Sequence, residues 1–195
     1  MQPDIQDKLD RYHALLLQWQ PKINLISPMT VDDAWERHFV DSIQVNDYIP
    51  HDVKTIADIG SGAGFPALVL AIMRPDIQFH LVESDTRKCS FLRNVSRETQ
   101  CENVTIYNAR IENILETIDC DCLTARALAS LKQLIAYAAP FWADNLDFQM
   151  VLPKGRQYQD EITDAKKQYA FEYDVHQSIT SDDAVILSVS NIKAR

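Results

Sequence analysis

The sequence predicts an α/β fold in which a mostly parallel seven-stranded sheet ends in an antiparallel hairpin. After residue 53, short apolar runs typical of strands alternate with stretches of helical periodicity, which indicates a parallel sheet covered by helices on both faces. The last two apolar runs, 171–176 and 185–189, face each other across a polar turn with no helix between them, which predicts the hairpin. Residues 1–52 show helical periodicity only, so we expect an N-terminal helical cap joined to residues 53–195 in one structural unit.

Two helices are expected in the cap. Apolar residues recur at spacings of three and four from residue 4 to residue 19, which is one face of a helix, and Pro21 closes it. Thr30 and Asp33 have the spacing of a capping box, so a second helix is expected to begin at Thr30 and to run through Ile43.

The other elements follow in strand–helix order. Each expected strand is a short apolar run, and each expected helix has apolar residues three and four positions apart. Besides the hairpin, the expected strands are 55–59, 78–82, 104–107, 122–125 and 148–152, and the expected helices are 65–74, 87–100, 131–139 and 157–169.

The composition excludes several classes of protein. The chain has 195 residues, of which 46% are hydrophobic and 24% charged, which is typical of a globular domain and not of a disordered or collagen-like chain. No apolar run approaches the roughly 20 residues of a membrane span. The first residues lack the basic and apolar regions of a signal peptide. We therefore expect a cytoplasmic protein without membrane contact.

The cysteines and the charge balance add two further expectations. The four cysteines show no C-x-x-C spacing, so we expect unbonded thiols and no zinc or other metal site. The 19 basic and 28 acidic side chains give a net charge of −9, which argues weakly against a nucleic-acid partner. However, residues 86–97 contain four basic side chains and no acidic one, so the distribution of charge matters more than its total.

Three of the four glycines lie at positions 60, 62 and 64, where the first strand turns into the next helix. Glycine there lets the chain turn tightly and lets a ligand approach the backbone. A dinucleotide-binding fold needs G-x-G-x-x-G, but Phe65 stands at the position of the third glycine, and no Gly-Lys-Ser/Thr of a P-loop follows. The spacing therefore favours an adenosine-type ligand that lies against the loop.

Glu83 ends the second strand, 23 residues after Gly60. An acidic residue near this position accepts hydrogen bonds from ribose hydroxyls in nucleotide-binding α/β folds, and it would repel a phosphorylated ribose. The alternative is a solvated acid beside an ordinary glycine turn. The ligand-binding interpretation is favoured because it explains both the glycine cluster and the acid.

These motifs resemble a known family. Asp58-Ile-Gly-Ser-Gly-Ala-Gly with Glu83 is similar to the first two motifs of class I S-adenosylmethionine-dependent methyltransferases. Over nearly its whole length, the chain resembles the RsmG (GidB) family, which methylates N7 of a guanine in 16S ribosomal RNA. Ala67 departs from the family pattern, because relatives commonly have glycine there. The residues that carry the likeness are Asn24-Leu25, Arg37-His38, Asp41-Ser42, Gly60 to Pro66, Glu83-Ser84, Lys88, Phe91 to Arg93, Arg110 to Glu112, Arg126-Ala127, Ala129 to Leu131 and Lys154-Gly155.

The resemblance implies a Rossmann-like class I methyltransferase fold with S-adenosylmethionine as cofactor. It also implies 16S ribosomal RNA or the small ribosomal subunit as partner, and we expect a monomer. Together with Glu83, the cofactor contacts that it implies are Gly60, Phe65, Ile111, Glu112 and Arg126.

The implied reaction needs no general base. Guanine N7 offers a free lone pair, so no proton must be removed before methyl transfer, and we expect alignment and electrostatics in place of a catalytic side chain. The sequence agrees, because Thr124-Ala-Arg-Ala follows the fourth strand where amino-methylating enzymes have Asn/Asp-Pro-Pro-aromatic. Cys120 and Cys122 are expected in the core and not as nucleophiles.

Basic side chains gather on one face of the expected helix 87–100 and near the same edge of the sheet. At about 100° per residue, three arginines of this helix lie within about a third of its circumference. We expect these bases to bind RNA phosphates, the alternative being an ordinary solvated helix face. The candidates are Arg87, Lys88, Arg93, Arg97 and Lys154, with Arg37 and Arg156 nearby.

Two other functions stay open at this point. The acidic charge favours a class I methyltransferase that acts on a small molecule or a protein, whereas the basic cluster and Arg126 favour RNA. A non-catalytic nucleotide-binding module with the same fold is the third possibility. His38 is a candidate RNA or cofactor contact, although a histidine inside an amphipathic helix is more often a hydrogen-bonded structural residue.

Overall fold

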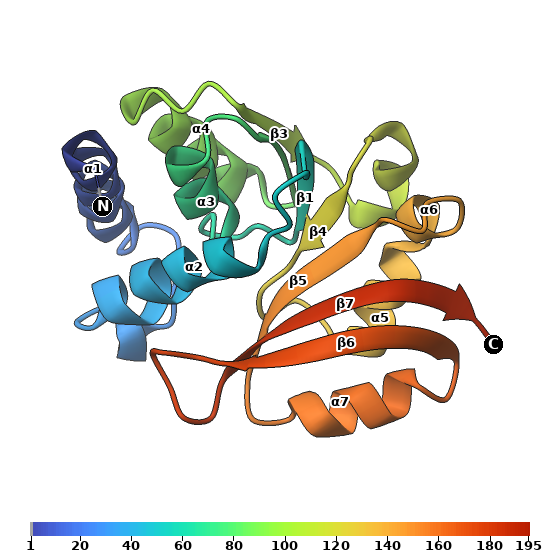
Figure 1. Cartoon of the computed structure of the whole chain (residues 1–195). Coiled ribbons are helices and arrows are strands. Elements are labelled where there is room, and N and C mark those ends of the chain that lie inside the picture. Colours follow the sequence, from blue (N-terminus) through green and yellow to red (C-terminus); the bar gives the residue numbers. More distant parts are fainter. Residues whose placement is uncertain (1) are drawn as a thin grey trace.

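Seven strands form one sheet in the computed structural model, which describes residues 2–195 (Figure 1). They are β1 Thr55–Ile59, β2 Gln78–Glu83, β3 Val104–Asn108, β4 Cys122–Thr124, β5 Gln149–Lys154, β6 Tyr169–Gln177 and β7 Val185–Ala194. Their order is β3-β2-β1-β4-β5-β7-β6, with parallel pairing among β1 to β5 and antiparallel pairing of β7 with β5 and β6. The predicted parallel sheet with a C-terminal hairpin is confirmed.

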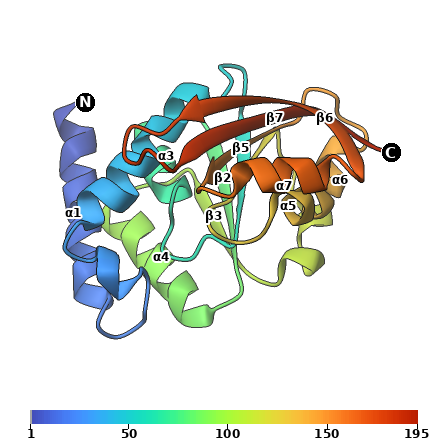
Figure 2. The ribbon, with the colours of Figure 1, turned by 90° about the horizontal axis from the view of Figure 1, so that it is seen from below.

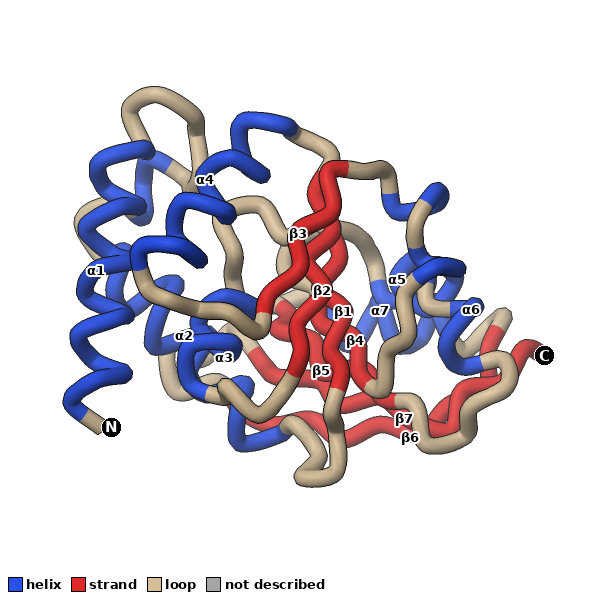
Figure 3. The backbone as a smooth tube through the Cα atoms, turned by 90° about the horizontal axis from the view of Figure 1, so that it is seen from above, coloured by secondary structure: helices blue, strands red, loops and turns tan. Residues whose placement is uncertain are grey.

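Helices cover both faces of this sheet, as the alternation of elements predicts. They are α1 Pro3–Trp19, α2 Asp41–Ile43, α3 Ala67–Met73, α4 Thr86–Glu98, α5 Leu131–Tyr137, α6 Ala139–Trp142 and α7 Tyr158–Ala165. Helices α1, α3 and α4 lie on one side, and α5, α6 and α7 lie on the other (Figures 2 and 3). Each side has its own apolar cluster, and neighbouring residues of β1 point to opposite sides, Ile56 toward α3 and α4 and Ala57 toward α5 and α7.

Helix α1 forms the first part of the cap and confirms the helix predicted from residue 4 to residue 19. Its buried face, which includes Leu9, Tyr12 and Leu16, packs against α3 and α4. These residues belong to the same apolar cluster as Ile56 of β1, so the packing runs without a break from the cap to the sheet. The proposed division of the chain at residue 52 stays a prediction.

The second part of the cap differs from the single helix expected there. It consists of a 3₁₀ turn at Pro28–Thr30, a π-helical segment at Trp35–Val40, the short α2 and a 3₁₀ turn at Gln44–Tyr48. The predicted start at Thr30 is wrong, because the Thr30 hydroxyl does not cap a helix. It donates to the carbonyl oxygen of Ser27 at 2.9 Å and contacts the ring of His38 at 2.9 Å.

Two other helix boundaries also differ from the prediction. Helix α3 begins at Ala67 and not at residue 65, because Gly64 has a φ of +95° and Phe65 precedes a proline, a position that disfavours helical backbone. Helix α7 ends well before residue 169, where β6 already begins. Boundaries of this kind depend on loop geometry, which apolar periodicity does not report.

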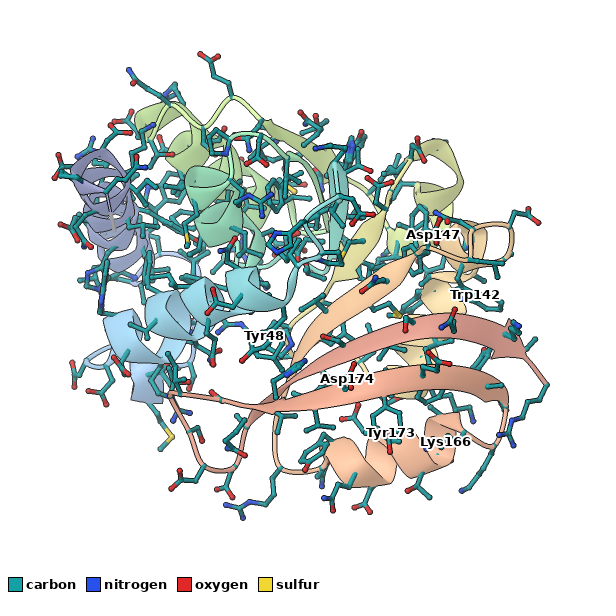
Figure 4. The ribbon with its side chains drawn as sticks, in the orientation of Figure 1. Tyr48, Trp142, Asp147, Lys166, Tyr173 and Asp174 are labelled. Carbon is teal, nitrogen blue, oxygen red and sulfur yellow. The ribbon has the colours of Figure 1, made fainter. Side chains whose placement is uncertain are left out.

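The hairpin of β6 and β7 closes the sheet beside the cap. Tyr48 of the cap stacks on His176 of β6 with ring centroids 4.0 Å apart, and Tyr48 is labelled between the cap and the hairpin in Figure 4. Near the hairpin tip, Thr180 Oγ1 donates to Asp41 Oδ1 at 2.8 Å. These contacts bring the cap and the hairpin together near the carboxyl end of β5.

Within residues 2–195, no helix is long and apolar enough to cross a membrane. The four cysteines are buried and have free thiols. Cys120 lies just before β4 and Cys122 lies within it, and both are buried in the core, as predicted. Burial raises the pKa of the Cys120 thiol to about 12, which keeps it in the unreactive protonated form.

Candidate functional site

The glycine loop, residues 60–64, lies at the carboxyl end of β1. Its three glycines have φ angles of +68°, +56° and +95°, which residues with side chains rarely adopt. At Gly60, a Cβ atom would also meet Leu128 Cδ1 at 2.6 Å. The loop therefore needs glycine for its turn, whereas the contact with the partly exposed Leu128 side chain could be relieved by a shift of that side chain.

Glu83, at the end of β2, is tied to this loop. Its carboxylate accepts a hydrogen bond from the backbone N–H of Gly62 at 2.9 Å and another from that of Asp85 at 2.8 Å. Each carboxylate oxygen has two lone pairs, so both keep acceptor capacity for the donors of a ligand. The structure thus places Glu83 beside the glycine loop with its carboxylate already oriented.

A cavity of about 360 Å³ opens beside Glu83, and we call it the edge cavity. It lies where β1, β2 and β3 end, opposite the segment that follows β4. Ile111 and Glu112, in the 3₁₀ turn after β3, line it together with Gly60 and Glu83. The structure therefore brings four of the six expected cofactor contacts into one cavity.

A second cavity, of about 470 Å³, lies between the glycine loop and the cap, and we call it the cap cavity. Its walls include Phe65 and Arg126, the other two expected cofactor contacts, and Thr30 and His38 from the cap. The glycine loop and Lys88 border both cavities. The two cavities are therefore neighbours on either side of the loop.

Arg126 follows β4 and reaches the cap. Its Nη2 donates to His38 Nδ1 at 3.0 Å, and its Nη1 lies 3.4 Å from both Asp41 Oδ2 and the carbonyl oxygen of Arg37. The guanidinium carbon lies 4.9 Å from the centroid of the Phe65 ring, a cation–π contact. Burial lowers the pKa of the Arg126 guanidinium, but arginine keeps its charge in proteins. A fixed cation therefore forms part of the wall of the cap cavity.

Aromatic side chains support the glycine loop from the cap side. Tyr12 of α1 stacks on Phe65 with ring centroids 5.3 Å apart, and its hydroxyl donates to the carbonyl oxygen of Ala63. Phe39 packs edge-on against Tyr12 at 4.9 Å and against Phe65 at 5.1 Å. Packing from the cap thereby fixes the loop between the two cavities.

Asp58, the first residue of the glycine motif, is fully buried at the end of β1. Its Oδ1 accepts a hydrogen bond from Thr124 Oγ1 at 2.7 Å, whereas its Oδ2 has no partner among the described residues. Burial raises the pKa of Asp58 to about 7, against the opposing effects of its hydrogen bonds and of Arg126. This acceptor without a partner is buried behind the glycine loop, outside the lining of both cavities.

The expected RNA-binding residues fall into two groups. Arg87, Arg93 and Arg97 are exposed on α4, and Lys88 in the first turn of this helix borders both cavities. Lys154 lies apart from them at the end of β5, where its ammonium contacts a carboxylate of α7 at 2.7 Å and its side chain is 8% exposed. The structure therefore places four of the five bases on α4, where Arg87 and Arg97 form exposed ion pairs with Asp85 and Glu98, and leaves Lys154 in a buried ion pair.

Comparison with known proteins decides the family. The model of the family described as GidB, rRNA small subunit methyltransferase G, matches residues 5–188. The chain belongs to the GidB family. The ribosomal RNA small subunit methyltransferase G of Ruegeria sp. is 41% identical over 191 residues, covering 96% of this chain and 91% of the relative. The protein of the same name from Paramagnetospirillum magneticum is 42% identical, covering 95% and 88%. The predicted family and the predicted class of enzyme, an rRNA methyltransferase, are confirmed.

Solved structures of other proteins share the fold of this GidB family member. A variant of MtNAS in complex with S-adenosylmethionine matches with a TM-score of 0.61 at 13% identity, covering 95% of this chain and 75% of that chain. A precorrin-6y methyltransferase from Geobacter metallireducens matches with a TM-score of 0.57 at 15% identity, covering 85% and 89%. At these identities the likeness concerns the fold, and the predicted Rossmann-like methyltransferase fold is confirmed.

For three side chains at or near these cavities, the structure shows contacts that the sequence does not predict. Helical periodicity placed Tyr12 on the apolar face of α1 but did not indicate its hydrogen bond to the glycine loop. Asp58 was visible as the start of the motif, yet its burial and its unpartnered oxygen were not. For His38, the sequence leaves open a contact with RNA or cofactor and a structural role, and the structure shows the side chain hydrogen-bonded and also in the wall of the cap cavity.

Proposed function

We propose that this GidB family member transfers the methyl group of S-adenosylmethionine to N7 of a guanine in 16S ribosomal RNA. The observation that carries the proposal is the pair of neighbouring cavities, with the Glu83 carboxylate in one and the Arg126 guanidinium in the other. The nucleoside end of S-adenosylmethionine carries ribose hydroxyls, which are donors, and its amino-acid end carries a carboxylate. The polar groups of the two cavities are complementary to these two ends.

The residues of the two cavities fit the successive parts of this cofactor, from the nucleoside to the methionine tail. In the edge cavity, Glu83 would accept hydrogen bonds from the ribose hydroxyls, and Ile111 and Glu112 would contact the adenine side. In the cap cavity, Arg126 would pair with the carboxylate of the methionine tail.

The chemistry matches what the chain offers. S-adenosylmethionine would supply a methyl group bound to a positively charged sulfur. The lone pair of guanine N7 would form the new bond to this methyl group, and the C–S bond would break with its electron pair going to sulfur. The positive charge would thereby pass to the guanine. No proton is removed, so the protein needs to bind and align and not to act as a base. The contacts of His38 agree with a reaction that has no general base, because both ring nitrogens already have hydrogen-bond partners, Nδ1 with Arg126 and Nε2 with Thr30.

A direct test is methyl transfer to RNA. Labelled S-adenosylmethionine is incubated with the protein and with 16S rRNA or small subunits from a strain lacking this methylation, and nucleosides are identified by mass spectrometry. We expect labelled 7-methylguanosine. Absence of transfer to naked RNA, intact subunits and assembly intermediates would contradict the RNA substrate, and label on another atom would contradict N7. Transfer to a small molecule or protein would favour the alternative class I activity.

For RNA contacts, we propose the bases of α4, Arg87, Lys88, Arg93 and Arg97, and Lys154 at the end of β5. The bases of α4, of which Lys88 borders both cavities, would bind phosphates, although the chain has a net charge of −9. Changing Arg93 to Glu should lower the rate of RNA methylation about tenfold at low salt, with unchanged affinity for S-adenosylhomocysteine. The matched control is Lys193→Glu on β7, which makes the same charge change on the hairpin and should have no effect. Equal effects of the two variants would contradict the interface.

A further inference from the structure

Arg126 needs fixed neighbours if it is to present a defined set of donors to a carboxylate. Three of its five N–H donors have partners, and the shortest contact is the one of 3.0 Å to His38 Nδ1. The Nε donor and one Nη2 donor have no acceptor within residues 2–195. Two donors of one guanidinium are the set that binds both oxygens of a carboxylate.

The hydrogen bonds determine the tautomer of His38. Arginine only donates, so Nδ1 must carry the lone pair and Nε2 must carry the proton. Nε2–H then donates to Thr30 Oγ1 at 2.9 Å, and the Thr30 hydroxyl donates to the carbonyl oxygen of Ser27 at 2.9 Å. In the chain of contacts from Arg126 through His38 and Thr30 to the carbonyl oxygen of Ser27, each hydrogen bond therefore has one possible donor and one possible acceptor.

A charged imidazole would disrupt this arrangement, because it would direct an N–H at the donors of Arg126. Burial lowers the pKa of His38 to about 4, and the positive charges of Arg126 and Arg37 act in the same direction. The ring also stacks on Phe65 with centroids 5.2 Å apart, and the same phenyl ring lies under the guanidinium. His38 therefore contacts both Arg126 and the surface on which Arg126 rests.

We propose that His38 is a positioning residue for the proposed S-adenosylmethionine site. As a neutral imidazole protonated at Nε2, which Thr30 fixes, it accepts from Arg126 and directs the two free donors of that guanidinium toward the carboxylate of the methionine tail. His38 does not touch the reacting atoms. This role rests on the proposed function, because it requires that a carboxylate occupies the cap cavity.

Two variants of His38 separate the two ring nitrogens. In His38→Asn, the amide oxygen can take the place of Nδ1 and accept from Arg126, whereas contact with Thr30 is lost. In His38→Gln, the amide reaches the place of Nε2 and contacts Thr30, whereas the acceptor at Nδ1 is lost. Thr30→Val removes the hydroxyl that fixes the tautomer, and Thr30→Ser keeps it.

The ligands separate the two ends of the site. Binding is measured by calorimetry with S-adenosylhomocysteine, which has the amino-acid tail, and with 5′-methylthioadenosine, which lacks it. We expect His38→Gln to weaken binding of S-adenosylhomocysteine about tenfold and that of 5′-methylthioadenosine less than twofold, with His38→Asn closer to wild type. Thr30→Val should give a smaller loss on S-adenosylhomocysteine alone, and Thr30→Ser none.

Several outcomes would overturn the role of His38. Equal losses on both ligands would show a merely structural effect, and equal losses in His38→Asn and His38→Gln would show that the Nδ1 acceptor does not matter. A second readout needs no ligand. The ¹⁵N chemical shifts of the His38 imidazole are assigned by the signals that are missing in His38→Gln, and they should show that Nε2 is protonated. A protonated Nδ1 would overturn the proposal. If wild type binds neither ligand while the ¹⁵N shifts show the expected tautomer, the proposed cofactor site fails, and with it the role assigned to His38.

Discussion

The edge cavity and the cap cavity share the glycine loop, yet they are built in different ways. The edge cavity forms where neighbouring parallel strands end, so Gly60 and Glu83 meet as a direct result of strand order. The cap cavity depends on hydrogen bonds between distant segments, Tyr12 to Ala63 across 51 residues and His38 to Arg126 across 88. We infer that the sheet provides the nucleoside end of the site, and that the cap adds recognition of the amino-acid tail.

The largest expected effect comes from Glu83→Ala. The variant removes the acceptor that we propose for both ribose hydroxyls, and it leaves the backbone N–H groups of Gly62 and Asp85 without their partner. Two charge-assisted hydrogen bonds at about 2 kcal/mol each correspond to a loss of affinity of roughly a thousandfold. Because the ribose belongs to the nucleoside end, calorimetry should show similar losses for S-adenosylhomocysteine and for 5′-methylthioadenosine.

Glu83→Gln is the control that separates the effect of the negative charge of the side chain from the effect of its size and shape. The amide keeps one oxygen acceptor in nearly the same place, so its loss of affinity should be smaller than that of the alanine variant. A loss confined to S-adenosylhomocysteine would contradict the assignment of Glu83 to the nucleoside end, and it would remove the difference between the two cavities.

Asp58→Asn tests the buried group behind the shared loop. The pKa of Asp58 in the folded protein, about 7, lies above its ordinary value of 3.8, so the folded protein binds this proton more tightly than the unfolded chain does. The stability that this proton adds is fully present below about pH 4 and is lost as pH rises through 7. From pH 5 to pH 8, wild type should therefore lose about 3 kcal/mol of unfolding free energy that the Asn variant does not lose.

Urea denaturation at the two pH values measures this difference. The Asn side chain still accepts from the Thr124 hydroxyl, so the main change is the loss of the titrating proton. Asp7→Asn makes the same substitution on the exposed face of α1 and should leave the pH dependence of wild type unchanged. Parallel pH curves for wild type and Asp58→Asn would show that Asp58 is ionised throughout this range.

The same contrast explains what the sequence could predict. The strand order, the glycine loop and Glu83 follow from local patterns, because parallel strands end at one edge and a short motif reports its own turn. The second cap segment could not be predicted, because Thr30 forms a tertiary contact with His38 and does not cap a helix. The ion pair of Lys154 with Glu161 of α7 is also a tertiary contact, so the position of Lys154 beside Gly155 in the sequence does not predict it.

The smallest expected effect comes from Tyr12→Phe, which removes one hydroxyl and keeps the aromatic packing of the cap. The carbonyl oxygen of Ala63 then loses its partner in a buried position, so the free energy of unfolding should fall by about 1–2 kcal/mol in urea denaturation. Tyr173→Phe deletes a hydroxyl from a half-exposed ring that Lys166 contacts on the hairpin, and it should cost nothing measurable. Because Tyr12 supports the loop from the cap side, its loss should also weaken S-adenosylhomocysteine more than 5′-methylthioadenosine. Equal weakening of the two ligands would mean that the cap stabilises the loop as a whole, and that the tail is recognised by the groups around Arg126 alone.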